Sequence, residues 1–356
     1  MSPFSGRAVA VTGPTGHVGA NLVRALLAQG ARVRCLVHSR RAALDGLDVE
    51  AVEGELANPE SLARTFRDVE VVFHLAARIS ITGSHGGLVE AVNVAGAEAV
   101  ARASHAAGAR RMVHVSSVHA FDHGDPSQPL TETAPRPTPK HPAYDRSKAA
   151  GEAAVRRVAA ETGLEVVVAH PTGVLGPNDF EPSRMGRTLL LLYYRRLPAL
   201  LDGGFDWVDV RDVVGGLMSL ADRGRPGESY LLSGAFQPIR GVAEVAARIT
   251  GRAPPRMDTP RWLASATAPL VATVQGWLGQ EPLYTPEALH AVFKGSRDVR
   301  SDKARVELGY TARPLEETLR DAYASFEAQG RLGGRAPGAA GGGGGRRGGR
   351  RGGEVK

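Results

Sequence analysis

Apolar residues in the first half of the chain occur in short runs, and the stretches between these runs have the spacing of amphipathic helices. Continuous apolar runs are typical of strands buried on both faces, and their alternation with helices is typical of a parallel sheet with right-handed crossovers. The pattern therefore predicts an α/β fold, with strands near residues 9–12, 32–37, 49–56, 71–77 and 111–115 and helices near 20–27, 59–67 and 88–108.

Glycine is concentrated at the junction between the first strand and the first helix. In such a junction one glycine permits the tight turn, one lets the backbone approach a phosphate, and one lets the helix pack closely on the strand. The helix N-terminus adds free N–H groups and the positive end of its dipole. The junction predicts a Rossmann doubly wound sheet that binds a dinucleotide through Gly13, Thr15, Gly16, His17, Val18 and Gly19.

The end of the second strand bears on the choice of cofactor. Units that select NAD carry an acidic residue about 20 positions beyond the glycines. Here no carboxylate follows Val37, and two guanidinium groups are available to pair with a 2′-phosphate. NADP (NADPH) is therefore the predicted cofactor, selected by His38, Arg40 and Arg41. In the alternative interpretation the two arginines are solvated charges on a loop, and NAD remains possible as the cofactor.

The third and fourth strands end at the same predicted edge of the sheet. Glu55 and Leu56 end the third strand, where an adenine would lie. The fourth strand ends in residues that leave room for a ligand, namely Leu75, Ala76 and Ala77. We interpret His74, which precedes them, as a packing residue rather than a catalyst.

Tyr144 and Lys148 lie four positions apart at the start of a predicted helix and so share one helix face. A phenol with a pKa near 10 is a poor proton donor or acceptor at neutral pH. A nearby ammonium group and the positive charge of oxidised nicotinamide would lower that pKa. Ser117, at the end of the fifth strand, is placed to bond the same carbonyl oxygen. The pattern predicts catalysis by Ser117, Tyr144 and Lys148.

With these motifs the chain resembles the extended short-chain dehydrogenase/reductases, also called the NAD-dependent epimerase/dehydratase family. The resemblance covers about residues 7–325, and it is closest to the dihydroflavonol reductase-like and 3β-hydroxysteroid dehydrogenase-like branches, with a hopanoid-associated sugar epimerase-like group nearby. The motifs on which this resemblance rests are residues 12–19, 74–77, 93–94, 116–117, 144–148, 170–177 and 207–213. The resemblance implies that Lys148 holds the nicotinamide ribose, and that further cofactor contacts come from Tyr144, Asn93, Pro171 and Val174.

Two departures from the family pattern limit the reaction. Glu55 stands where the family usually has Asp, which alters the adenine contact. In sugar-nucleotide 4,6-dehydratases an Asp-Glu pair follows the catalytic Thr, whereas Ser117 is followed by Val118 and His119. Elimination of water has no evident catalyst here, so dehydratase activity is disfavoured.

Three functions are compatible with these motifs. The first is an NAD(P)-dependent oxidoreductase that interconverts a ketone and a secondary alcohol on an apolar small molecule, with walls formed by the weakly charged stretches 185–201 and 262–278. The second is a sugar-nucleotide epimerase. It would bind a diphosphate through Arg184, Arg187, Arg195, Arg196 and Arg240. The third is a cofactor-sensing binding protein, which an intact Ser117, Tyr144 and Lys148 disfavours because a sensor needs no proton relay.

The stretch 262–278 has a second interpretation, an interfacial membrane patch. Pro269 and the lack of a basic face argue against a regular amphipathic membrane helix, so a pocket wall or ordinary packing is preferred. No apolar run reaches about 18 residues and no signal-like leader is evident, so we expect no membrane span and a cytoplasmic location. We expect Cys35, the single cysteine, to be buried and reduced.

The chain divides into three predicted parts. Residues 1–175 form the dinucleotide-binding domain, 176–330 form a mainly substrate-binding lobe with strands returning to the sheet, and 331–356 form a disordered Gly/Arg-rich tail. Residues 333–356 hold six cations and one acid, so they supply most of the net charge of +7. The folded part therefore has no basic surface for nucleic acid. We interpret the tail as an extension without a specific partner, and weak contact with RNA is the alternative. The sequence does not decide whether the protein forms a homodimer.

Overall fold

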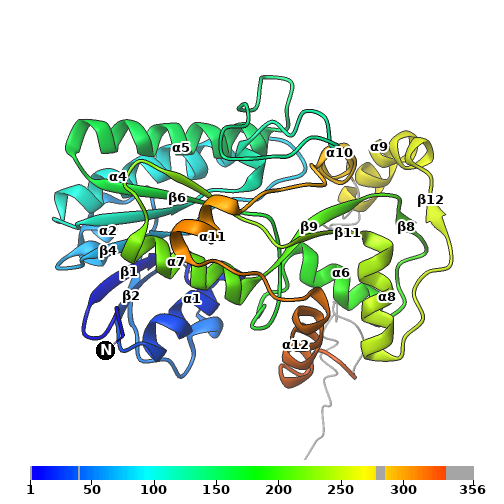
Figure 1. The fold of residues 1–356 in the computed structure, drawn as a ribbon, viewed down its shortest axis with the longest axis horizontal. Helices are drawn as coiled ribbons and strands as arrows, with labels where there is room; N and C mark the ends of the chain where they lie inside the picture. The colour runs from blue at the N-terminus through cyan, green and yellow to red at the C-terminus, as the bar shows by residue number, and fades with distance from the viewer. Residues whose placement is uncertain (1, 39–40, 278–284, 334–356) are drawn as a thin grey trace, which may run out of the picture.

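The computed structural model describes residues 2–38, 41–277 and 285–333 (Figure 1). Its main sheet has seven parallel strands in the order β10-β6-β5-β4-β1-β2-β3. This sheet confirms the predicted Rossmann-like α/β class. The strands are β1 Ala8–Thr12, β2 Arg32–Val37, β3 Glu50–Glu53, β4 Val71–His74, β5 Arg111–Val115, β6 Glu165–Pro171 and β10 Ser229–Leu232.

Helices cover both faces of this sheet because its central strands β1, β4, β5 and β6 are buried on both sides. One buried cluster joins the sheet to α1, α7 and α11, and a second joins it to α2, α4 and α5 (Figure 1). Cys35 lies fully buried in the first cluster, and burial raises the pKa of its thiol to about 12. These helices are α1 His17–Ala28, α2 Pro59–Phe66, α4 Gly96–Ala106, α5 Ala143–Thr162, α7 Val210–Arg223 and α11 Asp302–Leu308.

A smaller group of elements lies beside the carboxyl ends of the central strands (Figure 1). Its sheet has the order β11-β9-β7, and its core joins α6, α8 and α12. The short strands β8 Leu200–Leu201 and β12 Asp258–Thr259 pair at its outer side. The remaining elements are β7 Gly173–Leu175, β9 Gly204–Asp209, β11 Ala235–Pro238, α3 Leu88–Glu90, α6 Arg184–Tyr193, α8 Ile239–Thr250, α9 Arg261–Trp277, α10 Pro286–Lys294 and α12 Leu315–Ala328.

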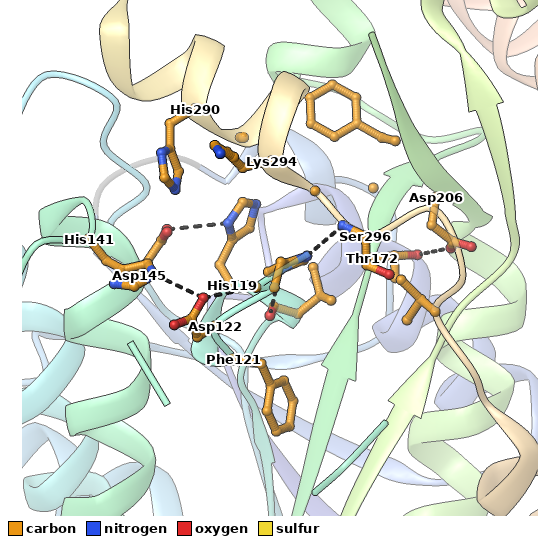
Figure 2. A pocket seen from close by; sticks show the side chains of 18 of the residues that line it. His119, Phe121, Asp122, His141, Asp145, Thr172, Asp206, His290, Lys294 and Ser296 are labelled. Carbon is orange, nitrogen blue, oxygen red and sulfur yellow. Dashed lines mark hydrogen bonds and ion pairs between the residues drawn. The ribbon is translucent and has the colours of Figure 1, made fainter. Parts of the chain in front are cut away.

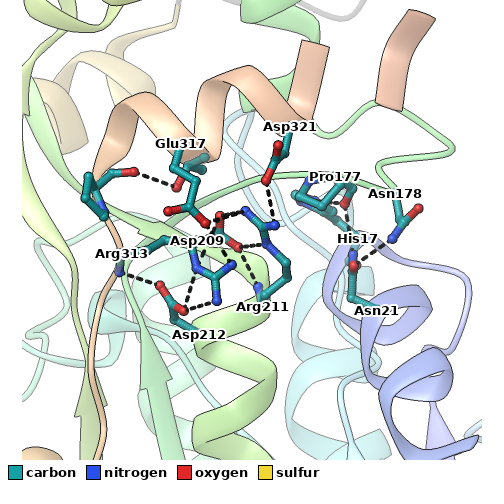
Figure 3. A network of polar contacts seen from close by, with 12 residues as sticks. His17, Asn21, Pro177, Asn178, Asp209, Arg211, Asp212, Arg313, Glu317 and Asp321 are labelled. Atoms are coloured by element: carbon teal, nitrogen blue, oxygen red, sulfur yellow. Dashed lines mark hydrogen bonds and ion pairs between the residues drawn. The ribbon is translucent and has the colours of Figure 1, made fainter. Parts of the chain in front are cut away.

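Buried ion pairs fasten this smaller group to the main sheet (Figure 3). Asp209 caps the N-terminus of α7 by accepting from the N–H of Arg211 at 2.7 Å, and its carboxylate also pairs with the Arg211 guanidinium. Arg313, just before α12, bonds Asp212 at 2.8 Å. Burial would raise the pKa of Asp209, but the bonds from Arg211 outweigh it and lower that pKa. The network thus keeps a buried carboxylate charged and paired.

The turn between β1 and α1 leaves no room for side chains at two of its glycines. Gly13 has a φ of +70°, and a Cβ there would lie 2.8 Å from the backbone N of Ala76. A Cβ on Gly19 would lie 2.1 Å from the carbonyl oxygen of Gly13. Gly13 is therefore required by the turn, and Gly19 by the close packing of α1 on that turn. Among the described residues, no helix is long and apolar enough to cross a membrane.

We expect Gly19→Ala to destabilise the fold by about 2 kcal/mol or more, because the added methyl group meets backbone that cannot move aside without opening the turn. Gly215→Ala is the matched control, since Gly215 is also helical and has no atom within 4 Å of an added Cβ. That substitution should stabilise α7 by up to about 1 kcal/mol. Urea unfolding of both variants measures the difference, and equal midpoints would contradict the steric account.

Candidate active site

The three predicted catalytic residues meet at the carboxyl ends of β5 and the start of α5. Ser117 follows β5 and caps a short 3₁₀ turn by accepting from the N–H of His119 at 3.2 Å. Tyr144 lies in the first turn of α5, close enough to Ser117 for the Ser117 side chain to lower the pKa of the phenol. Lys148, one turn further along α5, is 5% exposed and donates to the carbonyl oxygen of Val115 at 2.9 Å. The structure thus brings the sequence-predicted residues together.

Burial dominates the electrostatics of this group. It raises the pKa of Tyr144 to about 12, while the Ser117 bond acts in the opposite direction. Burial also lowers the pKa of Lys148 to about 8, opposed by the charge of Glu152. The sequence predicts a lowered pKa for Tyr144 beside Lys148 and oxidised nicotinamide. In the chain by itself, burial of the phenol is the largest influence and acts in the opposite direction, so the lowered pKa stays a prediction for the cofactor-bound state.

Glu152 fixes the helix that carries Tyr144 and Lys148. Its carboxylate is almost fully buried and accepts from Arg136 at 2.7 Å and from Arg156 at 2.9 Å. It also bonds the His170 ring on β6 at 2.8 Å. Arg156 lies on α5 itself, but Arg136 precedes α5 and His170 lies on β6, so this buried carboxylate constrains the orientation of α5 relative to β6.

The junction of β1 and α1 fits a dinucleotide pyrophosphate. Gly16 is the N-cap of α1, so no side chain bonds the first N–H groups of the helix, and its first turn carries no acidic residue. Thr15, Gly16, His17 and Val18 lie in this turn, but the His17 ring is bonded to the carbonyl oxygen of Pro177 at 3.1 Å. The helix N-terminus is thereby left to an anion.

Residues at the neighbouring strand ends support this turn. Thr12 Oγ1 bonds the His74 ring at 2.7 Å and accepts from the N–H of Ala76 at 3.3 Å. His74 is buried and stacks on His114, with ring centroids 5.3 Å apart, which confirms its packing role. Leu75, Ala76 and Ala77 continue from β4 beside Gly13, and Pro171 and Val174 lie at the end of β6 and in β7.

Asn93 has a structural set of bonds. The helix predicted over 88–108 contains a π-helical segment, Ala91–Ala95, at this residue. Asn93 accepts from the N–H of Arg78 at 2.7 Å and donates to Ser147 Oγ at 2.9 Å. It therefore ties the loop after β4 to α5, and its expected cofactor contact stays a prediction.

The predicted 2′-phosphate site carries acids as well as bases. Arg41 pairs with Glu53 at 3.1 Å, and His38 pairs with Glu55 at 3.0 Å; all four side chains are at least half exposed. Arg40 lies outside the described residues. Leu56 packs against Gly96 of α4, where a Cβ would lie 3.0 Å from its Cδ1. An exposed pair of this kind is worth little and can open for a phosphate.

Figure 2 shows a cavity of about 290 Å³. It lies next to the predicted catalytic residues, since Val118 and Asp145, which follow Ser117 and Tyr144 in sequence, line it. The segment after Ser117 forms one wall, and α10 and β9 contribute others. Its apolar lining comes from Val118, Phe121, Met185, Phe205 and Val299. Its titratable lining comes from His119, Asp122, His123, His141, Asp145, Asp206, His290 and Lys294.

The expected cavity walls are only partly correct. Met185 on α6 does line the cavity, but no described residue of 262–271 does. Instead α9 continues through Pro269 and packs through Ala264 and Ala268 beside Leu289 of α10. The small residues Ala264 and Ala268 serve helix packing, which is one of the two preferred roles, whereas Trp262 and Leu270 are 71% and 68% exposed.

Sequence reasoning missed two groups at the cavity. His119 bonds Asp145 at 3.2 Å, and its ring meets that of Tyr144 edge-on at 5.8 Å. His119 and Asp145 lie close to Ser117 and Tyr144 in the sequence, and this closeness is the signal that could have identified them as site residues. The helix α10 brings His290 and Lys294, and its Thr285-Pro286 start is a recognisable cap that was not used.

Comparison with known proteins places these features in a family. The family model described as "NAD dependent epimerase/dehydratase family" matches residues 9–233. The sterol demethylase protein B of Methylococcus capsulatus is 34% identical over 326 residues, with 90% of this chain and 99% of that protein covered. A putative dihydroflavonol 4-reductase of Synechocystis is 32% identical, with 90% and 94% covered.

Solved structures agree with these relatives. The crystal structure of gox2253 is 31% identical and superposes with a TM-score of 0.79, covering 91% of this chain and 99% of that one. A nucleoside-diphosphate-sugar epimerase from Pseudomonas aeruginosa is 25% identical, with a TM-score of 0.74 and coverages of 91% and 98%. The chain therefore belongs to the NAD-dependent epimerase/dehydratase family, whose members are NAD(P)-dependent oxidoreductases and epimerases.

Proposed function

We propose that the protein is an NADPH-dependent reductase that interconverts a ketone and a secondary alcohol on a largely apolar small molecule. The observation that carries the proposal is the placement of Ser117 and Tyr144 close enough for the Ser117 hydroxyl to lower the pKa of the phenol, beside a cavity and with Lys148 one helical turn away. This arrangement offers two hydroxyl groups to one carbonyl oxygen, which is what proton transfer to a reduced ketone requires.

Each of the three side chains has a distinct task in this reaction. A bound dihydronicotinamide, held at the β1–α1 turn, would supply the hydride for the carbonyl carbon. Ser117 donates to the carbonyl oxygen and holds it in line, and Tyr144 Oη gives it the proton. Lys148 stabilises the resulting phenolate, because its ammonium group lies on the same helix face and carries the opposite charge. Its bond to the Val115 carbonyl holds that ammonium in place, which reduces the reorganisation needed during turnover.

The charge of the cavity favours a reductase over a sugar-nucleotide epimerase. Three carboxylates line it, from Asp122, Asp145 and Asp206, against the single ammonium of Lys294 among the described lining residues. The five arginines considered for a diphosphate do not line it, and Arg240 is bonded to Asp258 at 2.6 Å. A diphosphate would therefore meet carboxylates of like charge.

The relatives support the same choice of substrate class. Among them are a ketoreductase of Stigmatella aurantiaca that acts on a farnesyl-bearing quinoline oxide, 32% identical, and 3β-hydroxysteroid dehydrogenases. Their printed names describe carbonyl or alcohol chemistry on large apolar molecules. We extend that chemistry to this chain as part of the proposal.

We expect Tyr144→Phe to lower kcat for ketone reduction by about 10²-fold or more, because the proton donor is removed. The dissociation constant for NADPH should change less than about threefold. Tyr323→Phe is the matched control, since Tyr323 bonds the Leu189 carbonyl within the smaller group and does not line the cavity. Its turnover should stay near that of the parent. NADPH oxidation rates and NADPH titrations measure both quantities, and a Tyr144→Phe enzyme with parental kcat would refute the assignment.

NADPH selection makes a separate prediction about the exposed pair of Arg41 and Glu53. Arg41→Ala should weaken NADPH binding by about fivefold and leave NADH binding unchanged, because only NADPH carries the 2′-phosphate. Glu53→Gln should act in the opposite direction, since it releases Arg41 and removes a nearby negative charge. Calorimetric titrations with both nucleotides test this. Equal changes for NADPH and NADH in either variant would show that this pair does not select the cofactor.

A further inference from the structure

Asp206 is a buried carboxylate in the wall of the cavity, and the reaction described above gives it no task. It lies on β9, is 7% exposed, and faces the cavity beside Thr172 (Figure 2). Other buried carboxylates in the described chain, such as Asp209, Asp212 and Glu152, are neutralised by arginines. Asp206 has no ion pair with a described residue.

The hydrogen bonds of Asp206 use only one of its two oxygens. Oδ1 accepts from Thr172 Oγ1 at 2.6 Å and from the N–H of Gly234 at 2.7 Å. Oδ2 accepts no hydrogen bond from the described residues. Oδ2 is not among the fully buried polar atoms without a partner, so it is open to the cavity and presents an acceptor to whatever occupies it.

The position of this acceptor complements the catalytic group. In Figure 2, Asp145 and His119 lie at one side of the cavity, and Thr172 and Asp206 lie at the other. Asp145 follows Tyr144 directly, so the reacting carbonyl belongs to the first side. A molecule that fills the cavity presents a different part of itself to Asp206.

We infer that Asp206 is a specificity-determining residue, whose Oδ2 accepts a hydrogen bond from a hydroxyl group that the substrate carries in addition to its reacting carbonyl. This inference rests on the proposed ketone reduction for its substrate class. It narrows that class from apolar ketones to apolar hydroxyketones, or to diols in the reverse direction. The hydroxyl is preferred to an ether or ester oxygen at this position because only a donor satisfies a carboxylate.

Flexible matched probes test the inference without requiring a known substrate. Decan-2-one, 10-hydroxydecan-2-one and 10-methoxydecan-2-one share one chain, and only the hydroxyl compound donates a hydrogen bond. For the parent enzyme with NADPH, kcat/KM should be about tenfold or more higher for the hydroxyl than for the methoxy compound, as expected for a bond to a charged acceptor. 10-Aminodecan-2-one shows whether an ammonium donor is accepted as well.

Two variants separate substrate recognition from a purely structural role. Asp206→Asn can keep its bonds to Thr172 and Gly234, but it turns an N–H₂ toward the cavity, so the hydroxyl-to-methoxy ratio should fall to about one. Thr172→Val is the matched control. It removes the bond between Thr172 and Asp206 but leaves Oδ2 in place, so the ratio should stay high. A structural role alone would change the two probes in parallel and leave the ratio unaltered in both variants.

A binding measurement keeps this test independent of turnover. Calorimetric titration of the NADP⁺-bound enzyme with decan-1-ol and with 1-methoxydecane should show the same preference for the alcohol, and Asp206→Asn should abolish it. If no ketone is reduced but this preference and its loss are found, the proposed function fails and the Asp206 assignment stands. If ketones are reduced with equal ratios in parent and variant, the reductase stands and the assignment of Asp206 is overturned.

Discussion

The close approach of backbone at the β1–α1 turn is the constraint on which the rest of the structure depends. Gly13 and Gly19 bring the turn, the end of β4 and the first turn of α1 into contact with no side chain between them. That contact points the uncapped helix N-terminus at the carboxyl edge of the sheet. Because the strands are parallel, β5 and β6 deliver Ser117 and Pro171 to the same edge, so one steric condition positions both the cofactor cradle and the catalytic group.

Burial then determines how the catalytic group behaves. It shifts the pKa values of Tyr144 and Lys148 in opposite directions, and each shift favours the neutral form. A phenol with a raised pKa holds its proton until a negative charge develops on the carbonyl oxygen. The buried Glu152 favours the charged form of Lys148, and its own three partners keep that carboxylate in place. The catalytic group is thus maintained by polar contacts that extend through α5 to β6.

Much of the fold followed from local patterns. The strand–glycine–helix junction and the helix predicted near 59–67 depend on residues close in sequence, and the structure has both. The spacing of Tyr144 and Lys148 places both on α5 for the same reason, while their catalytic role stays a prediction. The cavity could not be predicted in the same way, because its wall combines β9, α10 and the segment after Ser117. No local sequence pattern connects these three segments. A cavity wall was expected at residues 262–271, but it is not found there, because the apolar and small side chains typical of a pocket wall also suit helix packing. The predictions for Arg40 and for residues 334–356 concern positions outside the described residues.

The central claim is that this chain exchanges a nicotinamide cofactor with solution and uses it to reduce a ketone. The most direct measurement is to denature the purified protein, identify any released nucleotide, and follow the exchange of labelled NADPH into the native protein. A reductase must release its oxidised cofactor after each turnover, whereas an epimerase regenerates its cofactor within the cycle. We expect little retained nucleotide and rapid exchange with NADPH. Stoichiometric NAD that stays bound and does not exchange would contradict it.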